Sequence, residues 1–226
     1  VTYLLIFGDL PSQNQLDQFQ NDIREEALVD EDLKQIFKSF PKSAHPMGIL
    51  SSLTSALIAF NPQNETKISL KDKEGVTEDD KMYISTVRLL AKFPIMSSWT
   101  LRKIKGLPLN YSNNKLSYTE NIAYMMFAKP NQEYVQNDII VNALNTLLIL
   151  HADHEQNCST STVRIVGSSY AGLYASISAG ISALWGRLHG GANQAVIEML
   201  ELIKKDNSDI DKYLDKAKDK SDPFRL

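Results

Sequence analysis

Histidines are the residues of this sequence that most directly suggest chemistry, because imidazole can act as an acid, a base, a hydrogen-bond donor or a metal ligand near neutral pH. His151 and His154 lie three positions apart in HADHE, and His189 follows roughly 35 residues later in LHGGANQ. A helix would bring the first two to one side, where Asp153 and Glu155 flank them. Three of the four histidines therefore fall into two clusters that could belong to one site.

Three interpretations of the pair His151 and His154 are open. A metal site is conceivable, but HADHE lacks the spacing of a zinc-binding helix and has no cysteine support, so we predict no metal. Both rings can instead be satisfied by hydrogen bonds at a helix end. Alternatively, they face an anionic substrate.

The segment that follows, NCSTSTVR, is rich in hydroxyl groups. One interpretation is a polar turn that caps the next helix, since Asn, Ser and Thr accept hydrogen bonds from free backbone N–H groups. Another is a set of groups that orient an imidazole. Nothing here lowers the pKa of a thiol, so we expect Cys158 to be a small buried residue and not a nucleophile.

His189 precedes two glycines and an amphipathic segment, QAVIEMLELIKK. Gly190 and Gly191 permit close backbone approach, and Asn193 can cap the helix. The positive end of that helix would disfavour an imidazolium, which would leave His189 neutral and able to donate to an oxygen that gains negative charge. On these residues alone, a turn histidine with no chemical role is the preferred interpretation.

The elements that must position these residues are helices, because apolar residues recur at spacings of three and four and sustained alternation is almost absent. We predict an all-α protein. Ser12 and Gln15 form a capping-box pattern before a helix at 13–27, and Ser117 with Glu120 repeats that pattern. Asp30 can cap the next helix.

The apolar content of the 47–60 segment predicts a helix buried on more than one side. The 77–106 segment should be helical with a kink near Pro94. The 137–156 segment predicts one long helix whose first half can be buried. The 167–184 segment carries no charge, but its serines and glycines favour a buried helix of a soluble protein over a membrane span. There, alanines at every fourth position from 171 to 183 indicate tight helix packing. We see no linker and predict one helical domain.

Composition excludes several partners. The net charge is −3 and the charges are interspersed, so no basic face is available for nucleic acid. No segment indicates a membrane anchor or a signal peptide. The single cysteine excludes an internal disulfide and suits a reducing compartment, which favours the cytoplasm.

Three segments together resemble citrate synthase of the bacterial type in residue identity, order and spacing. They are LILHADHEQNCSTSTVRIVGSS, LWGRLHGGANQAVIEML and AKDKSDPFRL. Weaker similarity extends over nearly the whole chain. The resemblance implies a helical fold and condensation of acetyl-CoA with oxaloacetate and water to give citrate and CoA. It implies no bound cofactor, acetyl-CoA being a cosubstrate, and a homodimer or a hexamer of dimers.

The resemblance also implies roles for individual residues. His189 matches the histidine that hydrogen-bonds the acetyl carbonyl and stabilises the enol. His154 matches a histidine that binds oxaloacetate, with Asn157 near it and His151 in the same motif. Ser159 matches the hydroxyl that orients the catalytic histidine.

The same resemblance implies that residues 1–226 form most of a large domain, without a preceding N-terminal region and without a C-terminal small domain. The family's aspartate base, its second polarising histidine and its carboxylate-binding arginines would lie beyond Leu226, so we expect this fragment alone to be inactive. Two positions depart from the family pattern. Arg187 stands where proline is usual, and Leu173 stands where the pattern SSxAxPY is usual.

Two other functions compete with this one. A 2-methylcitrate synthase would use propionyl-CoA, and a noncatalytic helical oligomerisation module would need no base. Bacterial enzymes of this type can also be inhibited by NADH, and SAHPM with His45 resembles part of the effector site.

Overall fold

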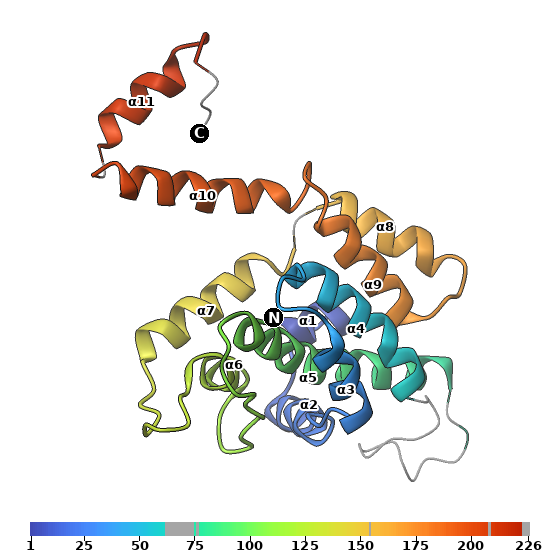
Figure 1. The fold of residues 1–226 in the computed structure, drawn as a ribbon. Coiled ribbons are helices and arrows are strands. Elements are labelled where there is room, and N and C mark those ends of the chain that lie inside the picture. The colour runs from blue at the N-terminus through green and yellow to red at the C-terminus, as the bar shows by residue number, and fades with distance from the viewer. Residues whose placement is uncertain (62–74, 76, 154, 208, 223–226) are drawn as a thin grey trace. The chain divides into compact units, whose positions relative to one another are not determined.

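The computed structural model describes residues 1–61, 75, 77–153, 155–207 and 209–222. Within these ranges it contains eleven α-helices and no strand, which confirms the expected all-α class (Figure 1). In chain order they are α1 (Thr2–Phe7), α2 (Gln13–Glu25), α3 (Glu31–Ser39), α4 (Pro46–Phe60), α5 (Glu78–Ile104), α6 (Tyr118–Phe127), α7 (Asp138–Leu150), α8 (Cys158–Gly167), α9 (Leu173–Leu184), α10 (Gly191–Lys205) and α11 (Ile210–Lys218).

Contacts divide the chain into two compact units, Val1–Ser182 and Ala183–Leu226. The interpretation of residues 1–226 as one partial domain stays a prediction. Over the described ranges, no helix has the length and apolar character needed to cross a membrane.

Side chains start the helices where the sequence signals them. Ser12 and Gln15 form a capping box at α2, and Ser117 and Glu120 form another at α6. Asp30 accepts from the Asp32 N–H at 2.8 Å and so caps α3. These three expectations are confirmed. Caps of this kind can be predicted from sequence because they depend on residues only two or three positions apart.

The helix α5 is the centre of the first unit. It contacts α2, α4 and α6, and it contributes more buried side chains than any other described helix. Trp99 and Met96 of α5 are fully buried together with Phe37 of α3 and Leu53 of α4. Burial of side chains of this size is the main favourable contribution to folding.

Cations of α5 bind the carbonyl ends of α2 and α3. The Lys92 ammonium donates to Glu26 O at 2.7 Å, and the Lys103 ammonium donates to Phe37 O at 2.9 Å. The last carbonyls of a helix have no partner within it and carry partial negative charge. The two α5 side chains therefore donate hydrogen bonds to the unpaired carbonyl oxygens of these helix ends and also balance their partial negative charge.

The end of α6 is bound in the same way. The guanidinium of Arg102, which is fully buried, donates to Ala128 O at 2.8 Å and to Met126 O at 3.3 Å. Burial lowers the pKa of Arg102 and of Lys103, which reflects the cost of removing a cation from water. The carbonyl oxygens offset that cost.

A buried ion cluster reinforces the α2–α5 contact. The Glu26 carboxylate accepts from Arg88 Nε at 3.2 Å and lies 3.6 Å from Lys92 Nζ. All three side chains are buried. Removing one partner from such a cluster would leave an uncompensated charge in the core.

Pro94 lies inside α5 at the position where a kink was expected. Proline has no N–H, so the Leu90 carbonyl lacks its usual helical donor. The Tyr118 hydroxyl of α6 donates to Leu90 O at 2.9 Å and replaces the missing bond. The α5–α6 contact thus compensates for the proline.

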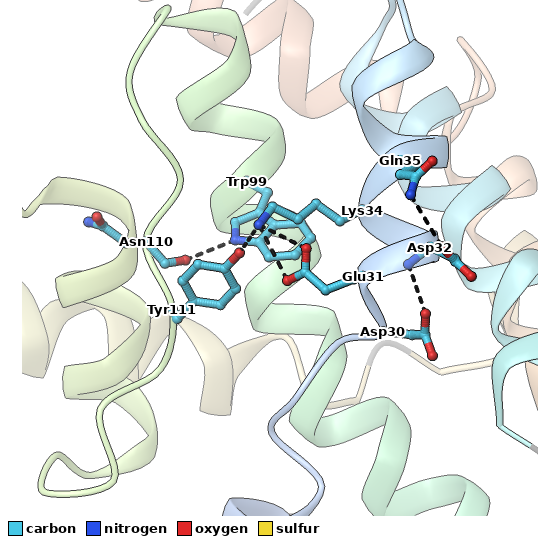
Figure 2. Close-up of polar contacts among 8 residues, drawn as sticks. All are labelled: Asp30, Glu31, Asp32, Lys34, Gln35, Trp99, Asn110 and Tyr111. Atoms are coloured by element: carbon cyan, nitrogen blue, oxygen red, sulfur yellow. Dashed lines mark hydrogen bonds and ion pairs between the residues drawn. The ribbon is translucent and has the colours of Figure 1, made fainter.

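Figure 2 shows how the segment before α6 is attached to α3 and α5. The Trp99 indole donates to Asn110 O at 2.8 Å, and its ring meets Tyr111 edge-on at a centroid distance of 5.6 Å. The Lys34 ammonium contacts the Tyr111 hydroxyl and lies 3.2 Å from the Glu31 carboxylate. The Tyr111 side chain therefore joins the segment before α6 to α3 through Lys34 and to α5 through Trp99.

The first half of α7, whose apolar residues allow burial, is not buried in this structure. None of its side chains is buried, and Ile139 is 81% exposed. The main contacts of α7 are with α6 alone, so most of its apolar surface faces outward. Apolar sequence pattern indicates what a helix can bury but not whether a partner covers it.

The 167–184 segment is not one helix. Positive φ angles at Tyr170 and Gly172 form a turn between α8 and α9, so Ala171 lies outside the helix and the alanine stripe is shorter than expected. Figure 1 shows α8 and α9 side by side. A Cβ at Gly180 would lie 2.5 Å from Val163 Cγ2, so close packing does occur here.

We predict that Lys103→Met lowers the free energy of unfolding of the chain by about 1.5 kcal/mol, because hydrogen bonds from a charged donor to the end of α3 are lost. Lys105→Met replaces an exposed lysine two positions further along the chain. It should change the free energy of unfolding by less than about 0.5 kcal/mol. Urea denaturation of both variants measures the difference. Equal midpoints would contradict this role of Lys103.

Candidate functional site

His151 lies immediately after the last residue of α7 and is exposed. Its backbone N–H donates to Leu147 O at 3.0 Å, and its ring Nδ1 lies 2.8 Å from the same oxygen. A carbonyl oxygen can only accept, so Nδ1 carries a proton. In the neutral ring, Nε2 is therefore an acceptor. For His151, this geometry agrees with the interpretation that its ring is satisfied by a hydrogen bond at a helix end.

The prediction that one helix continues to residue 156 is wrong. The helix α7 ends at Leu150, and Asp153 accepts from the Glu155 N–H at 3.1 Å in the connection that follows. Glu155 has a φ of 56°, which a helix does not allow. The helix that was expected to carry both histidines on one face therefore ends before His151. His154 itself lies outside the described residues.

Asn157 and Ser159 come together at the start of α8. Asn157 Oδ1 accepts from the Thr160 N–H at 3.0 Å and from the Ser159 hydroxyl at 2.6 Å. Both side chains are half-buried. The expected helix cap is confirmed, and its amide is held in a fixed orientation by two donors.

Cys158 is exposed, so the expectation of a buried thiol is wrong. It is the first residue of α8, directly after the capping Asn157. The sequence pattern shows that cysteine is commonly buried, but not whether another element covers the first turn of α8.

Arg164 was not singled out from the sequence. Its guanidinium Nη1 donates to Gln156 Oε1 at 3.1 Å, which links α8 to the residue before its cap. The two residues are eight positions apart, a spacing that falls outside the local patterns used to read capping from sequence. The guanidinium adds a positive charge beside the connection.

His189 lies directly before Gly190, the residue that caps α10. It is half-buried, and its backbone N–H donates to Gly186 O at 2.9 Å. Its expected place at a helix start is confirmed. The expected cap at Asn193 is wrong, because two glycines allow the helix to begin earlier and the Asn193 N–H bonds to Gly190 O at 3.1 Å, inside the first turn.

The first turn of α10 carries no acidic side chain. The partial positive charge of its free N–H groups is therefore not offset within that turn. An imidazole beside such a helix start can donate to an oxygen that becomes negative during a reaction. His151, Asn157 and Ser159 belong to the first unit, whereas His189 belongs to the second.

Among the residues that the structure describes, no three histidine, cysteine or acidic side chains gather to hold a metal. His154 is not one of these residues, so the metal interpretation of HADHE is not tested. His45 has a local structural role, because its Nδ1 accepts from the Met47 N–H at 3.2 Å and caps α4.

Comparison with known proteins identifies close relatives. Residues 1–226 match the family model described as citrate synthase, C-terminal domain. The chain is 46% identical over 226 residues to citrate synthase 1 of Mycobacterium tuberculosis. It is 45% identical over 227 residues to the citrate synthase of Corynebacterium glutamicum. Each alignment covers 100% of this chain and 50% of the relative. The chain thus spans about half the length of the curated relatives it matches.

Solved structures agree with this similarity. The citrate synthase of Pyrobaculum aerophilum superposes with a TM-score of 0.82 at 28% identity, over 100% of this chain and 54% of that one. A ternary complex of the Thermoplasma acidophilum enzyme with carboxymethyl coenzyme A and oxaloacetate gives 0.75 at 23% identity, over 89% of this chain and 49% of that one. At the latter identity the likeness shows the fold alone.

We predict that Asn157→Ala lowers the free energy of unfolding by about 1 kcal/mol, because α8 loses its capping acceptor. Asn157→Asp keeps an acceptor at the same place and should stay within a few tenths of the parent, about 0.3 kcal/mol. Urea or thermal denaturation of the two variants compares them. A large loss in Asn157→Asp would show that the amide nitrogen, and not the cap, carries the stability.

Proposed function

The chain belongs to the citrate synthase family, and from this premise we propose that the protein of which it is part condenses acetyl-CoA with oxaloacetate and water to give citrate and CoA. The observation that carries the proposal is the 46% identity to a citrate synthase over all 226 residues. Because the chain spans about half of that relative, the activity is assigned to the longer protein.

His189 is assigned to the carbonyl of the acetyl thioester. A base removes a proton from the acetyl methyl carbon, and the electron pair moves toward the thioester oxygen. A hydrogen bond from His189 stabilises that oxygen as negative charge develops. The position before α10 supports this role, because the first turn has no acid that would favour the imidazolium. The base is an aspartate that the resemblance places beyond Leu226.

The enol carbon then attacks the keto carbon of oxaloacetate, and water cleaves the thioester. His151, His154 and Asn157 are assigned to oxaloacetate. Since Nδ1 of His151 donates to Leu147 O, a hydrogen bond from Nε2 to a carboxylate requires the protonated ring. Ser159, which donates to Asn157 in this structure, keeps its proposed role in orienting the catalytic histidine as a prediction.

Further parts of the proposal rest on the resemblance. They are acetyl-CoA as a cosubstrate without a bound cofactor, a homodimer or hexamer of dimers, NADH as an effector at a site that includes His45, and the bacterial cytoplasm as the location. His45 already caps α4, so an NADH contact would have to use Nε2 of its ring.

The proposal predicts thiol release that depends on oxaloacetate when acetyl-CoA is given to the full-length protein. The 226-residue chain alone should release none, because the resemblance assigns the base to an aspartate outside residues 1–226. Colorimetric detection of free CoA, with and without oxaloacetate, measures both. Release by the chain would contradict its predicted inactivity. No release by the full-length protein would favour a noncatalytic oligomerisation module.

The variant His189→Ala tests whether this activity depends on His189. His189→Ala in the full-length protein removes one donor to the developing negative charge, which is worth about 10²- to 10³-fold in kcat. An unchanged kcat would separate the activity from His189.

Substrate choice has its own prediction. Acetyl-CoA should be preferred over propionyl-CoA in kcat/KM by about 10-fold or more, since one methylene in a fitted pocket is worth about that much. Parallel turnover measurements with the full-length protein decide it. A preference for propionyl-CoA would identify a 2-methylcitrate synthase.

A further inference from the structure

We propose that Gly190 is a positioning residue for His189, and that it acts by allowing the chain to close against the carbonyl oxygen of Leu184. The proposal rests on the catalytic role assigned to His189. It concerns residues 184–191 alone, all of which belong to the second unit.

Gly190 approaches the backbone at the end of α9 more closely than any side chain permits. A Cβ at this position would lie 2.1 Å from Leu184 O and 3.1 Å from Leu184 C. Contacts below 3.0 Å essentially never occur for real Cβ atoms. The obstacle is a backbone carbonyl, which cannot rotate away as the end of a flexible side chain would.

The requirement for glycine here is one of space and not of backbone angles. Gly190 has φ −65° and ψ −20°, which any residue can adopt. Alanine would therefore keep its backbone conformation and still meet Leu184 O. Relief of that contact requires Gly190 and Leu184 to move apart.

Such a movement would reach His189 directly. The Gly190 N–H donates to Leu184 O at 2.9 Å, and the His189 N–H donates to Gly186 O at 2.9 Å. These two bonds close a short loop that ends at the histidine. If the first bond lengthens, His189 loses the support that determines its place before α10.

Gly191 provides a matched control. A Cβ there would lie 3.3 Å from Gly186 O and 3.7 Å from Arg187 Cβ, so a shift of a few tenths of an ångström accommodates it. Gly190 is the N-cap of α10, where alanine is less favourable than glycine, whereas Gly191 is the first helical residue, where alanine improves helix propensity. Of the two variants, only Gly190→Ala places a Cβ against the Leu184 carbonyl oxygen.

The kinetic test uses the full-length protein. Gly190→Ala should lower kcat by about 10²-fold, the usual effect of moving a reacting group by about 1 Å, and leave KM for oxaloacetate within about threefold. Gly191→Ala should stay within about threefold of the parent in both. In a His189→Ala background, Gly190→Ala should cost less than about threefold more, because residues that act through one another are not additive.

A second measurement does not depend on activity. Diethyl pyrocarbonate modifies histidine rings, and mass spectrometry gives a separate rate for each peptide of the full-length protein. Gly190→Ala should change the rate at His189 by at least about threefold and leave His45 and His151 unchanged, whereas Gly191→Ala should change none. If the parent protein lacks synthase activity, the proposed function fails and these rates still test the positioning.

Several results would overturn the proposal. They are a kcat of Gly190→Ala within twofold of the parent, equal losses with and without His189, equal effects of the two glycine variants, or an unchanged modification rate at His189. Faster modification of His151 in Gly190→Ala would show that the glycine is needed for folding, and would overturn it too.

Discussion

Hydrogen bonds from the cations of α5 to the carbonyl ends of α2, α3 and α6 are the interaction on which the first unit depends. Lys92, Arg102 and Lys103 each bind a helix end that would otherwise present unpaired oxygens and partial negative charge to the interior. One helix thereby fixes where three others stop. The helix α6 contacts α7 in turn, and α7 ends at His151. The position of that histidine is therefore set by charges buried far from it in sequence.

Features that depend on neighbouring residues could be predicted from the sequence. The caps at Ser12, Asp30 and Ser117 and the helix start after His189 need only a few positions to be recognised. The bond between Lys103 and Phe37 joins residues 66 positions apart and has no local signal. The all-α class followed from periodicity because every described helix repeats the same pattern, whereas the partners of α5 depend on tertiary contact.

In the candidate site, too, some features could be predicted from the sequence and others could not. A helix was predicted through HADHE because the apolar period of α7 runs up to Leu150, yet the carboxylate of Asp153 takes the Glu155 N–H, which a further helical turn would use. The cap at Asn193 failed because Gly190 supports an earlier start, and glycine is compatible with many conformations. Roles in catalysis came from resemblance to a family. Residue chemistry alone made a reactive His189 plausible but favoured a turn histidine.

The proline in α5 has a consequence for motion. Because the Leu90 carbonyl depends on the Tyr118 hydroxyl, the middle of α5 is fully hydrogen-bonded only while the start of α6 is docked. Release of α6 would therefore leave the Leu90 carbonyl without its protein donor, so the docking of α6 contributes to the hydrogen bonding of α5 at Pro94. The residue that weakens α5 is also the one that links it to α6.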